Sequence, residues 1–321
     1  MVKRTIVFLL MACLLLAWLP QVAYAITPVE VDRQCSLSLR YSRLESDITM
    51  AAWDCSRCRN GFAQVEVRGY RIADVAADGT YTLTDDFADY PVNIYGITDQ
   101  AEWKEVSSTL AAYAAADELE PELTAETDDA GTADFQELKT GMYLVCAVDV
   151  ADEGTMYQFE DFIVCLPQQQ EDGSFSYAVS AAPKYKSQPI KPQEVDFQVV
   201  KLWKDVGEET RRPSSVTVDI LKNGEVYTSQ TLSKENDWTY RWKAPDDGSR
   251  WQVAERDVPK GYQVAVGGDG RSFTLTNTYD GGQEKPPQTG DTTALWPLVL
   301  AMCLSGGGLI LMGCFGMRKR S

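Results

Sequence analysis

The feature that most constrains the fold of this chain is a series of short apolar runs with period two, separated by turn residues. In the second half of the chain, these runs start at Val195, Val216, Trp251 and Phe273. Alternation of apolar and polar residues is the pattern of a strand with one buried face, and Asn223-Gly224 between two runs is a turn sequence. Many short strands at this spacing are typical of an all-β sandwich. We therefore predict a β-sandwich domain over residues 195–280.

The first half predicts a second mainly β domain, over residues 26–186, that also contains one helix. Its strand-like runs cover residues 36–41, 62–72, 142–148, 157–166 and 175–181. Residues 99–119 differ, because their apolar side chains recur at helical spacing on one face. That face consists of Trp103, Val106, Leu110 and Tyr113. Asp99 and Glu102 form a capping-box pair at its start, so we expect an amphipathic helix laid across one face of the strands.

Charge and composition exclude several kinds of function. The net charge is −17, whereas nucleic-acid binding requires basic patches, so we expect no nucleic-acid partner. The chain has no histidine, which excludes Ser-His-Asp and Cys-His catalysis and any histidine-ligated metal. Cys55 and Cys58 have metal-ligand spacing, but no second pair completes a site. We therefore expect no metal, no cofactor and no enzyme turnover; the alternative is a surface enzyme that uses the Cys55–Cys58 pair.

Outside the apolar stretches 6–19 and 294–317 the chain contains an odd number of cysteines, namely Cys35, Cys55, Cys58, Cys146 and Cys165. An odd count leaves at least one thiol unpaired or joined to another chain. Cys146 and Cys165 fall in strand-like runs and are most simply small buried side chains. The pairing of the five is left open.

The N-terminus has the three parts of a secretory signal. Lys3 and Arg4 precede an apolar stretch over residues 6–19, and Ala23-Tyr24-Ala25 follows as a small-x-small site. This order predicts a signal peptide over residues 1–25. We expect cleavage between Ala25 and Ile26.

The C-terminus combines a short motif, an apolar span and a basic tail. The motif, within residues 281–290, reads Pro286-Pro287-Gln288-Thr289-Gly290. Residues 294–317 are uncharged and long enough to cross a bilayer as a helix, and the basic tail 318–321 is expected to stay in the cytoplasm. The order resembles the sorting signal of Gram-positive wall-anchored proteins.

That resemblance implies two partners, a sortase and a peptidoglycan precursor. The sortase would cut between Thr289 and Gly290 and join Thr289 to an amine of the precursor, which places the protein on the cell wall. The family pattern has Leu where Pro286 stands here. A proline has no N–H and a fixed φ, so the alternative is a module that stays in the membrane because its motif is not cleaved.

Several motifs in residues 195–280 resemble a Cna B-type domain. They are Val200-Lys201-Leu202-Trp203, Arg212-Pro213-Ser214-Ser215-Val216, Asn236-Asp237-Trp238, Val253-Ala254-Glu255, Gly261-Tyr262 and Thr276-Asn277-Thr278-Tyr279. The resemblance implies an isopeptide bond between Lys201 and Asn277, assisted by the acid Glu255. Strand parity places Lys201 on the apolar face and Lys204 on the opposite face. The alternative is a surface Lys201 in a salt bridge with Glu255.

The first domain resembles, more loosely, the N-terminal domain of Gram-positive pilus proteins. The run from Gly131 to Val145 fits the end of such a unit, and Phe175 to Lys184 partly fits the pilin motif. In that motif a lysine is joined to the sorting signal of the next subunit, so Lys184 would be the acceptor. The alternative is an ordinary solvated lysine at the end of a domain.

Taken together, these patterns predict a mainly β chain with two tandem immunoglobulin-like or Cna B-type sandwiches. Residues 187–194, with Pro189 and Pro192, are expected to form a short stiff linker between them, and a transmembrane helix follows the second. The predicted role is a wall-anchored structural or adhesive surface protein. Its further partners would be other pilin subunits or an extracellular ligand, which the sequence does not name.

Overall fold

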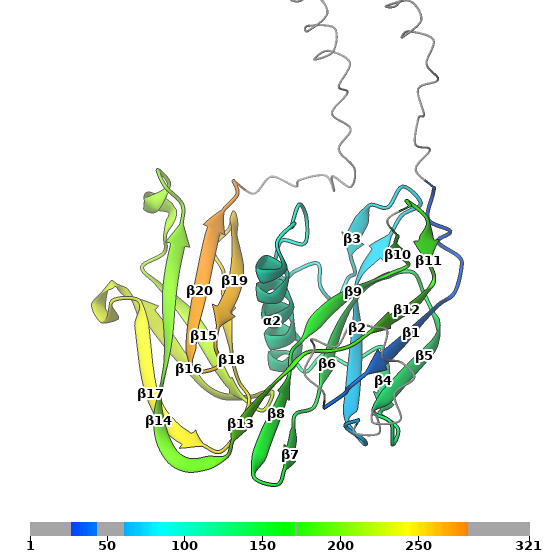
Figure 1. Cartoon of the computed structure of the whole chain (residues 1–321). Helices are drawn as coiled ribbons and strands as arrows, with labels where there is room; N and C mark the ends of the chain where they lie inside the picture. Colours follow the sequence, from blue (N-terminus) through cyan, green and yellow to red (C-terminus); the bar gives the residue numbers. More distant parts are fainter. Residues whose placement is uncertain (1–26, 44–60, 171, 282–321) are drawn as a thin grey trace, which may run out of the picture.

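The computed structural model describes residues 27–43, 61–170 and 172–281 as two β-sandwiches with one α-helix between them (Figure 1). The signal peptide, Cys55, Cys58, the motif from Pro286 to Gly290 and the predicted span 294–317 lie outside the described residues. No helix within the described ranges is long and apolar enough to cross a membrane.

The first sandwich is formed by two main sheets. One has the order β12-β1-β5, with β12 (Ala178–Ala181), β1 (Cys35–Arg40) and β5 (Thr132–Leu138). The other has the order β3-β2-β6-β9, with β4 also paired to β2, and comprises β3 (Tyr81–Leu83), β2 (Glu66–Val75), β6 (Gly141–Ala147), β9 (Phe162–Leu166) and β4 (Leu123–Glu126). Alternate residues such as Leu37 and Leu39 of β1 meet Tyr143 and Val145 of β6 in a common core.

Smaller sheets extend this sandwich. They are β13-β8-β7 and β10-β11, formed by β7 (Val150–Asp152), β8 (Thr155–Phe159), β10 (Gln168–Gln169), β11 (Phe175–Ser176) and β13 (Tyr185–Pro189). The predicted single run over residues 157–166 is therefore two strands, β8 and β9. Glu160 and Asp161, which belong to neither strand, separate them.

The second sandwich has one four-stranded and one three-stranded sheet. The first has the order β17-β14-β20-β19, with β17 (Thr239–Asp246), β14 (Lys191–Lys204), β20 (Ser272–Tyr279) and β19 (Tyr262–Gly268). The second has the order β16-β15-β18, with β16 (Glu225–Ser233), β15 (Ser215–Lys222) and β18 (Trp251–Arg256). Two 3₁₀ turns, η2 (Glu209–Arg211) and η3 (Lys234–Asn236), connect strands. The first and last strands, β14 and β20, are parallel neighbours.

Helix α2 (Gln100–Ala116) starts where the sequence predicts, since the Asp99 side chain accepts a hydrogen bond from the backbone N–H of Ala101. The prediction of one apolar face was incomplete, because the helix is buried on two sides. It contacts β6 and β9 of the first sandwich and β18 and β19 of the second. The small residues Ala111, Ala112 and Ala114 are buried, which allows both domains to approach the helix closely.

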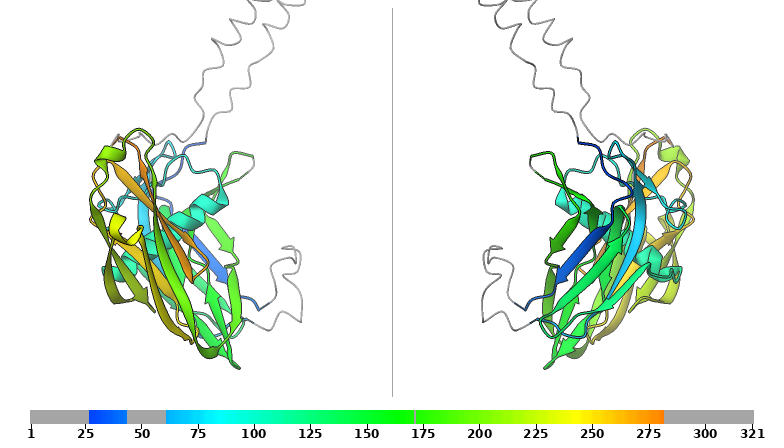
Figure 2. Two further views of the ribbon diagram at one scale, coloured as in Figure 1. Left: turned by 90° about the vertical axis from the view of Figure 1, so that its left-hand side faces the viewer. Right: turned by 90° about the vertical axis from the view of Figure 1, so that its right-hand side faces the viewer.

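One continuous apolar cluster therefore runs from the first domain through the helix into the second. It includes Met142 and Leu144 of β6, Leu110 of α2 and Val253 of β18. Strand β6 is buried on both faces, which explains its unbroken apolar sequence. The two side views in Figure 2 show that the second sandwich overlies the first, so the domains pack side by side rather than end to end.

The predicted linker over residues 187–194 is not a free connector. Its first part belongs to β13, which pairs with β8 of the first domain. Its last part belongs to β14, where Lys191 and Glu194 pair with β17 of the second domain. Backbone hydrogen bonds to both domains, rather than proline stiffness alone, thus hold this connection.

Candidate functional site

Lys201, Glu255 and Asn277 meet inside the second sandwich. Lys201 lies on β14 and Asn277 on the neighbouring strand β20, whereas Glu255 comes from β18 of the facing sheet. They are 3%, 1% and 0% exposed, respectively. The fold thus brings together the three residues that the resemblance selects, across two sheets and up to 76 positions of sequence.

Strand parity accounts for the burial of Lys201. It shares a face of β14 with Phe197 and Val199, both of which are buried. Lys204 is exposed on the other face, as the alternation predicts. The alternative of a surface Lys201 is therefore wrong, although its pairing with Glu255 is observed.

Glu255 contacts both of its partners through different carboxyl oxygens. The Lys201 Nζ lies 3.2 Å from Glu255 Oε2, and the Asn277 Nδ2 donates a hydrogen bond to Glu255 Oε1 at 2.7 Å. The Lys201 Nζ also donates to the carbonyl of Leu275 at 3.5 Å and lies 4.3 Å from the centroid of the Trp203 ring. The carboxyl group therefore sits between the amine and the carboxamide.

Two buried acceptor atoms of the site, Asn277 Oδ1 and Glu255 Oε2, lack a hydrogen-bond donor among the described residues. Among the described residues, none donates a hydrogen bond to Asn277 Oδ1, and Glu255 Oε2 has Lys201 at ion-pair distance without hydrogen-bond alignment. Buried acceptors without a donor are costly. A proton on Glu255 would give the carboxyl a donor of its own, which is the form that can polarise the carboxamide.

Burial shifts both titratable groups toward their neutral forms. Desolvation lowers the pKa of Lys201 to about 8, although the neighbouring Glu255 opposes this shift. Desolvation also raises the pKa of Glu255, against the attraction of Lys201 and the hydrogen bond from Asn277. A neutral amine is a nucleophile and a neutral carboxyl is a hydrogen-bond donor. The pair is thus suited to attack on an amide, with no cofactor or metal required.

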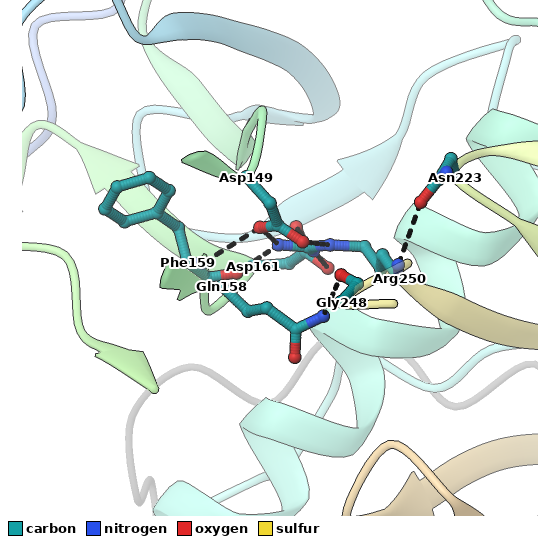
Figure 3. A network of polar contacts seen from close by, with 7 residues as sticks. All are labelled: Asp149, Gln158, Phe159, Asp161, Asn223, Gly248 and Arg250. Carbon is teal, nitrogen blue, oxygen red and sulfur yellow. Dashed lines mark hydrogen bonds and ion pairs between the residues drawn. The ribbon is translucent and has the colours of Figure 1, made fainter. Parts of the chain in front are cut away.

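A second polar cluster, which the sequence did not predict, joins the two domains at Arg250. Its guanidinium reaches from the second sandwich to Asp149 and Asp161 of the first (Figure 3). The Arg250 Nε lies 2.9 Å from Asp149 Oδ2, and Nη1 lies 3.1 Å from both oxygens of Asp161. Gln158 adds a hydrogen bond to the carbonyl of Gly248 at 3.3 Å.

The acidic partners of Arg250 are largely buried, which makes this cluster an interdomain lock. Burial works to lower the pKa of Arg250, but Asp161 and Asp149 together raise it, so the arginine stays charged. Burial raises the pKa of Asp161, and Arg250 opposes that shift. No spacing in the sequence signals such a contact, because its partners are about 90 to 100 residues apart and belong to different domains.

The remaining predicted residues lie elsewhere. Lys184 is exposed in the segment between β12 and β13, and its carbonyl accepts a hydrogen bond from the N–H of Glu160 at 2.8 Å. It lies 17 positions before Lys201 in the sequence, and among the described residues no hydrogen bond or ion pair joins it to Lys201, Glu255 or Asn277. Cys35, Cys146 and Cys165 are free thiols, and burial raises the pKa of each.

Comparison with known proteins gives a family for the second domain. The model of the Cna protein B-type domain matches residues 197–278. No curated protein sequence matches the chain. Among solved structures, a single B repeat unit of the collagen-binding surface protein of Staphylococcus aureus matches at 15% identity, covering 77% of this chain and 98% of the repeat unit, with a TM-score of 0.26.

The structures of a pilin and of a fimbrial protein are also similar. The major pilin SpaD of Corynebacterium diphtheriae matches at 12% identity, covering 79% of this chain and 99% of the pilin, with a TM-score of 0.28. The fimbrial protein FimP of Actinomyces oris matches at 15% identity, covering 83% of this chain and 66% of FimP, with a TM-score of 0.32. Likenesses of this size carry no argument about function. Residues 197–278, which hold Lys201, Glu255 and Asn277, are a Cna B-type domain.

Proposed function

We propose that this chain is a cell-surface structural or adhesive protein whose second domain is closed by an isopeptide bond between Lys201 and Asn277. The observation that carries the proposal is the burial of these two side chains on adjacent strands, with Glu255 in contact with both. A buried lysine that served stability alone would be costly, since burying a charge requires compensation. A reaction that removes the charge accounts for its position.

The contacts support the following reaction. The neutral Nζ of Lys201 attacks Cγ of Asn277, while the protonated Glu255 polarises the carboxamide by donating to Oδ1, the buried acceptor that otherwise has no donor among the described residues. Glu255 then accepts a proton from Nζ and supplies one to Nδ2, the atom with which it is already hydrogen-bonded. The C–N bond to Nδ2 breaks, ammonia leaves, and a new amide joins the two strands. Glu255 returns to its initial state, so the process is a single turnover within one molecule and not enzymatic turnover.

The position of the bond suits a protein that bears force. Strand β14 follows the first domain, and β20 is the last described strand before the sorting motif. Because β14 and β20 are parallel neighbours, a pull between the first domain and the C-terminus shears them apart. A bond from Lys201 to Asn277 would carry that force through one covalent link.

The proposal predicts a branched peptide in a tryptic digest of the purified chain, joining the Lys201 peptide to the Asn277 peptide with loss of one ammonia. Glu255→Gln should slow its formation by about 100-fold or more, because general acid–base groups contribute on this scale. Lys204→Ala, exposed on the same strand, should leave the yield unchanged. Separate, unmodified Lys201 and Asn277 peptides in the unchanged chain would refute the bond.

We further propose that a sortase joins Thr289 to a peptidoglycan precursor on the cell wall of a Gram-positive bacterium. The support is the order of the sequence: an N-terminal signal, the motif Pro286 to Gly290, an apolar span over residues 294–317 and a basic tail. Pro286 makes retention in the membrane the alternative outcome.

A second candidate function is a pilus subunit polymerised through Lys184, which the exposure of that lysine between β12 and β13 favours. Wall material released by a muramidase, boiled in SDS and blotted for the first domain should then show a ladder of high-mass bands. Lys184→Arg should abolish the ladder, whereas Lys186→Arg, at an exposed position two residues away, should preserve it. Material at monomer mass in the wall fraction would support single display, and recovery only in the membrane fraction would contradict cleavage at Thr289.

A further inference from the structure

The sheet edges beside Glu255 are closed by the first domain. Strand β18, which carries Glu255, ends the order of its sheet, and β19 ends the order of the facing sheet among the described strands. Helix α2 contacts both β18 and β19, and it stands beside them in Figure 1. The helix therefore covers one open side of the second sandwich.

Three hydrogen bonds attach the first domain to these edges. The Tyr113 hydroxyl donates to the backbone carbonyl of Glu255 at 2.7 Å, and the N–H of Val266 donates to the Thr109 hydroxyl at 2.8 Å. Both bonds are buried. The N–H of Val264 donates to the carbonyl of Pro91, also at 2.8 Å. Backbone groups of an edge strand need partners when water is excluded, and here the first domain supplies them.

The residue after Glu255 is held as well. The Arg256 Nη1 lies 2.6 Å from Oδ1 of Asp117, the residue that caps the C-terminal end of α2. The Arg256 Nε lies 2.6 Å from Oδ2 of Asp219 on β15. The backbone of Glu255 is thus fixed from the helix side by its own carbonyl and by its neighbour's side chain.

We propose that helix α2 of the first domain completes the bond-forming centre of the second domain, with Tyr113 as a positioning residue for Glu255. The inference rests on the proposed isopeptide function. Tyr113 does not contact the reacting atoms; it acts by holding the strand position from which the Glu255 carboxyl reaches Lys201 and Asn277. Displacing a reacting carboxyl group by about 1 Å can slow a reaction by about 100-fold.

Water exclusion gives the helix a second effect. The neutral amine and neutral carboxyl depend on a dry site, since hydration favours the charged forms. A second sandwich whose β18–β19 side was open would admit water beside Glu255. Bond formation should therefore follow docking of the two domains, and a closed bond would mark chains in which both domains have folded together.

The test uses the full chain, synthesised in a cell-free system with mild detergent and quenched at intervals in acid denaturant. The fraction of branched Lys201–Asn277 peptide then gives the rate of bond formation. Tyr113→Phe removes one hydroxyl and should slow the reaction about three- to tenfold, the range expected for loss of one hydrogen bond. Thr109→Val, which removes the partner of Val266 on the other edge, should slow it in the same direction.

Tyr143→Phe is the matched control. Tyr143 is buried in the core of the first domain, and its hydroxyl donates a hydrogen bond to the carbonyl of Lys139 at 3.0 Å. The substitution removes one hydroxyl bond within the first domain and none to Glu255 or Asp117, so the rate should stay within twofold of the unchanged chain. Equal rates for the unchanged chain and for the Tyr113→Phe and Thr109→Val chains would overturn the inference while leaving the bond itself established. No branched peptide in the unchanged chain would overturn the proposed function, and the inference with it.

The pH profile of the rate separates positioning from a general loss of stability. The reactive state of the Lys201–Glu255 pair holds one shared proton, so the rate should rise and then fall with pH. Tyr113→Phe should admit water, which favours the charged form of the Lys201–Glu255 pair. The maximum rate should therefore fall, and the two limbs of the profile, where the rate rises and where it falls with pH, should move apart. The nearby charges, Asp205 beside Lys201 and the Arg256–Asp117–Asp219 cluster behind Glu255, are unchanged by the substitution. A profile scaled down with unmoved limbs would indicate a merely structural role and contradict the proposal.

Discussion

Asn277→Ala is expected to lower the free energy of unfolding of the second domain by about 4–5 kcal/mol. The bond between Lys201 and Asn277 closes a loop of roughly 75 residues, and the chain-entropy estimate for a cross-link of that length is about 4.5 kcal/mol. For a domain of this size the melting temperature should fall by about 15 °C or more. Thermal unfolding followed by circular dichroism measures the shift.

The pH dependence of the Asn277→Ala chain gives a second signature. Its Lys201 keeps a free amine, whose pKa burial lowers from 10.5 to about 8. Between these values the unfolded chain binds a proton that the folded chain has lost, so stability should rise with pH, by at most about 1.4 kcal/mol per pH unit. In the unchanged chain Lys201 would be an amide that does not titrate, and this rise should be absent.

Thr278→Ala is the control for this prediction. Thr278 is the next residue of β20, exposed on the opposite face, and its replacement should change stability by no more than about 0.5 kcal/mol. Lys201→Ala should destabilise the domain as Asn277→Ala does, but its stability should not rise between pH 8 and 10.5, because it has no lysine at this position to titrate. Equal melting temperatures for the unchanged and Asn277→Ala chains would contradict a covalent bond at this position.

Arg250→Ala is expected to lower the free energy of opening of the interface between the two domains by about 3 kcal/mol. Removing one partner from a buried ion pair costs about 3–5 kcal/mol, and we take the lower end because the Arg250 side chain is 21% exposed. Asp149 and Asp161, which are 11% and 8% exposed, would lose their counter-charge. Native-state hydrogen exchange is the measurement, because it reports local opening.

The expected result is confined to the interface. The N–H groups of Val264 and Val266, which bond to the first domain, should exchange about 100-fold faster, as an opening energy lowered by about 3 kcal/mol implies. Amides inside each sandwich should keep their protection. Arg241→Ala removes an exposed arginine whose 3.4 Å contact with Gln198 stays within the second domain. It should therefore change the exchange rates neither of the interface amides nor of the amides inside the sandwiches. Unchanged protection of Val264 and Val266 in Arg250→Ala would refute the lock.

Much of the local structure follows from patterns within single segments. Alternation at Phe197, Val199 and Lys201 predicts a strand with Lys201 on the buried face, because successive side chains of a strand point to opposite sides. Asp99 predicts the start of α2, because its side chain can cap a free backbone N–H. The choice of Glu255 and Asn277 as partners of Lys201 came from the family resemblance and from no spacing, since their contact depends on how two sheets face one another.

The tertiary structure decided how the domains relate. The helical pattern of Trp103, Val106, Leu110 and Tyr113 predicts one apolar face. The alanines of α2 do not reveal a second face, because alanine is common on both buried and exposed helix surfaces, but in the structure they contact the second domain. The run over residues 187–194 suggested a linker because prolines stiffen chains, yet pairing with β8 and β17 made it strand. A charged residue such as Arg250 looks like any solvated arginine until its partners are known.

The sequence by itself determined several of the strands, among them β1, β2 and β14, the start of helix α2, and which face of β14 is buried. These properties depend on local periodicity and side-chain chemistry, which the order of residues records directly. Only the tertiary structure decided that Glu255 bridges Lys201 and Asn277, that Tyr113 and Arg250 tie the domains together, and that the second sandwich is closed by the first. Such contacts join residues from 22 to 142 positions apart, where the preference of a residue for burial does not specify its partner.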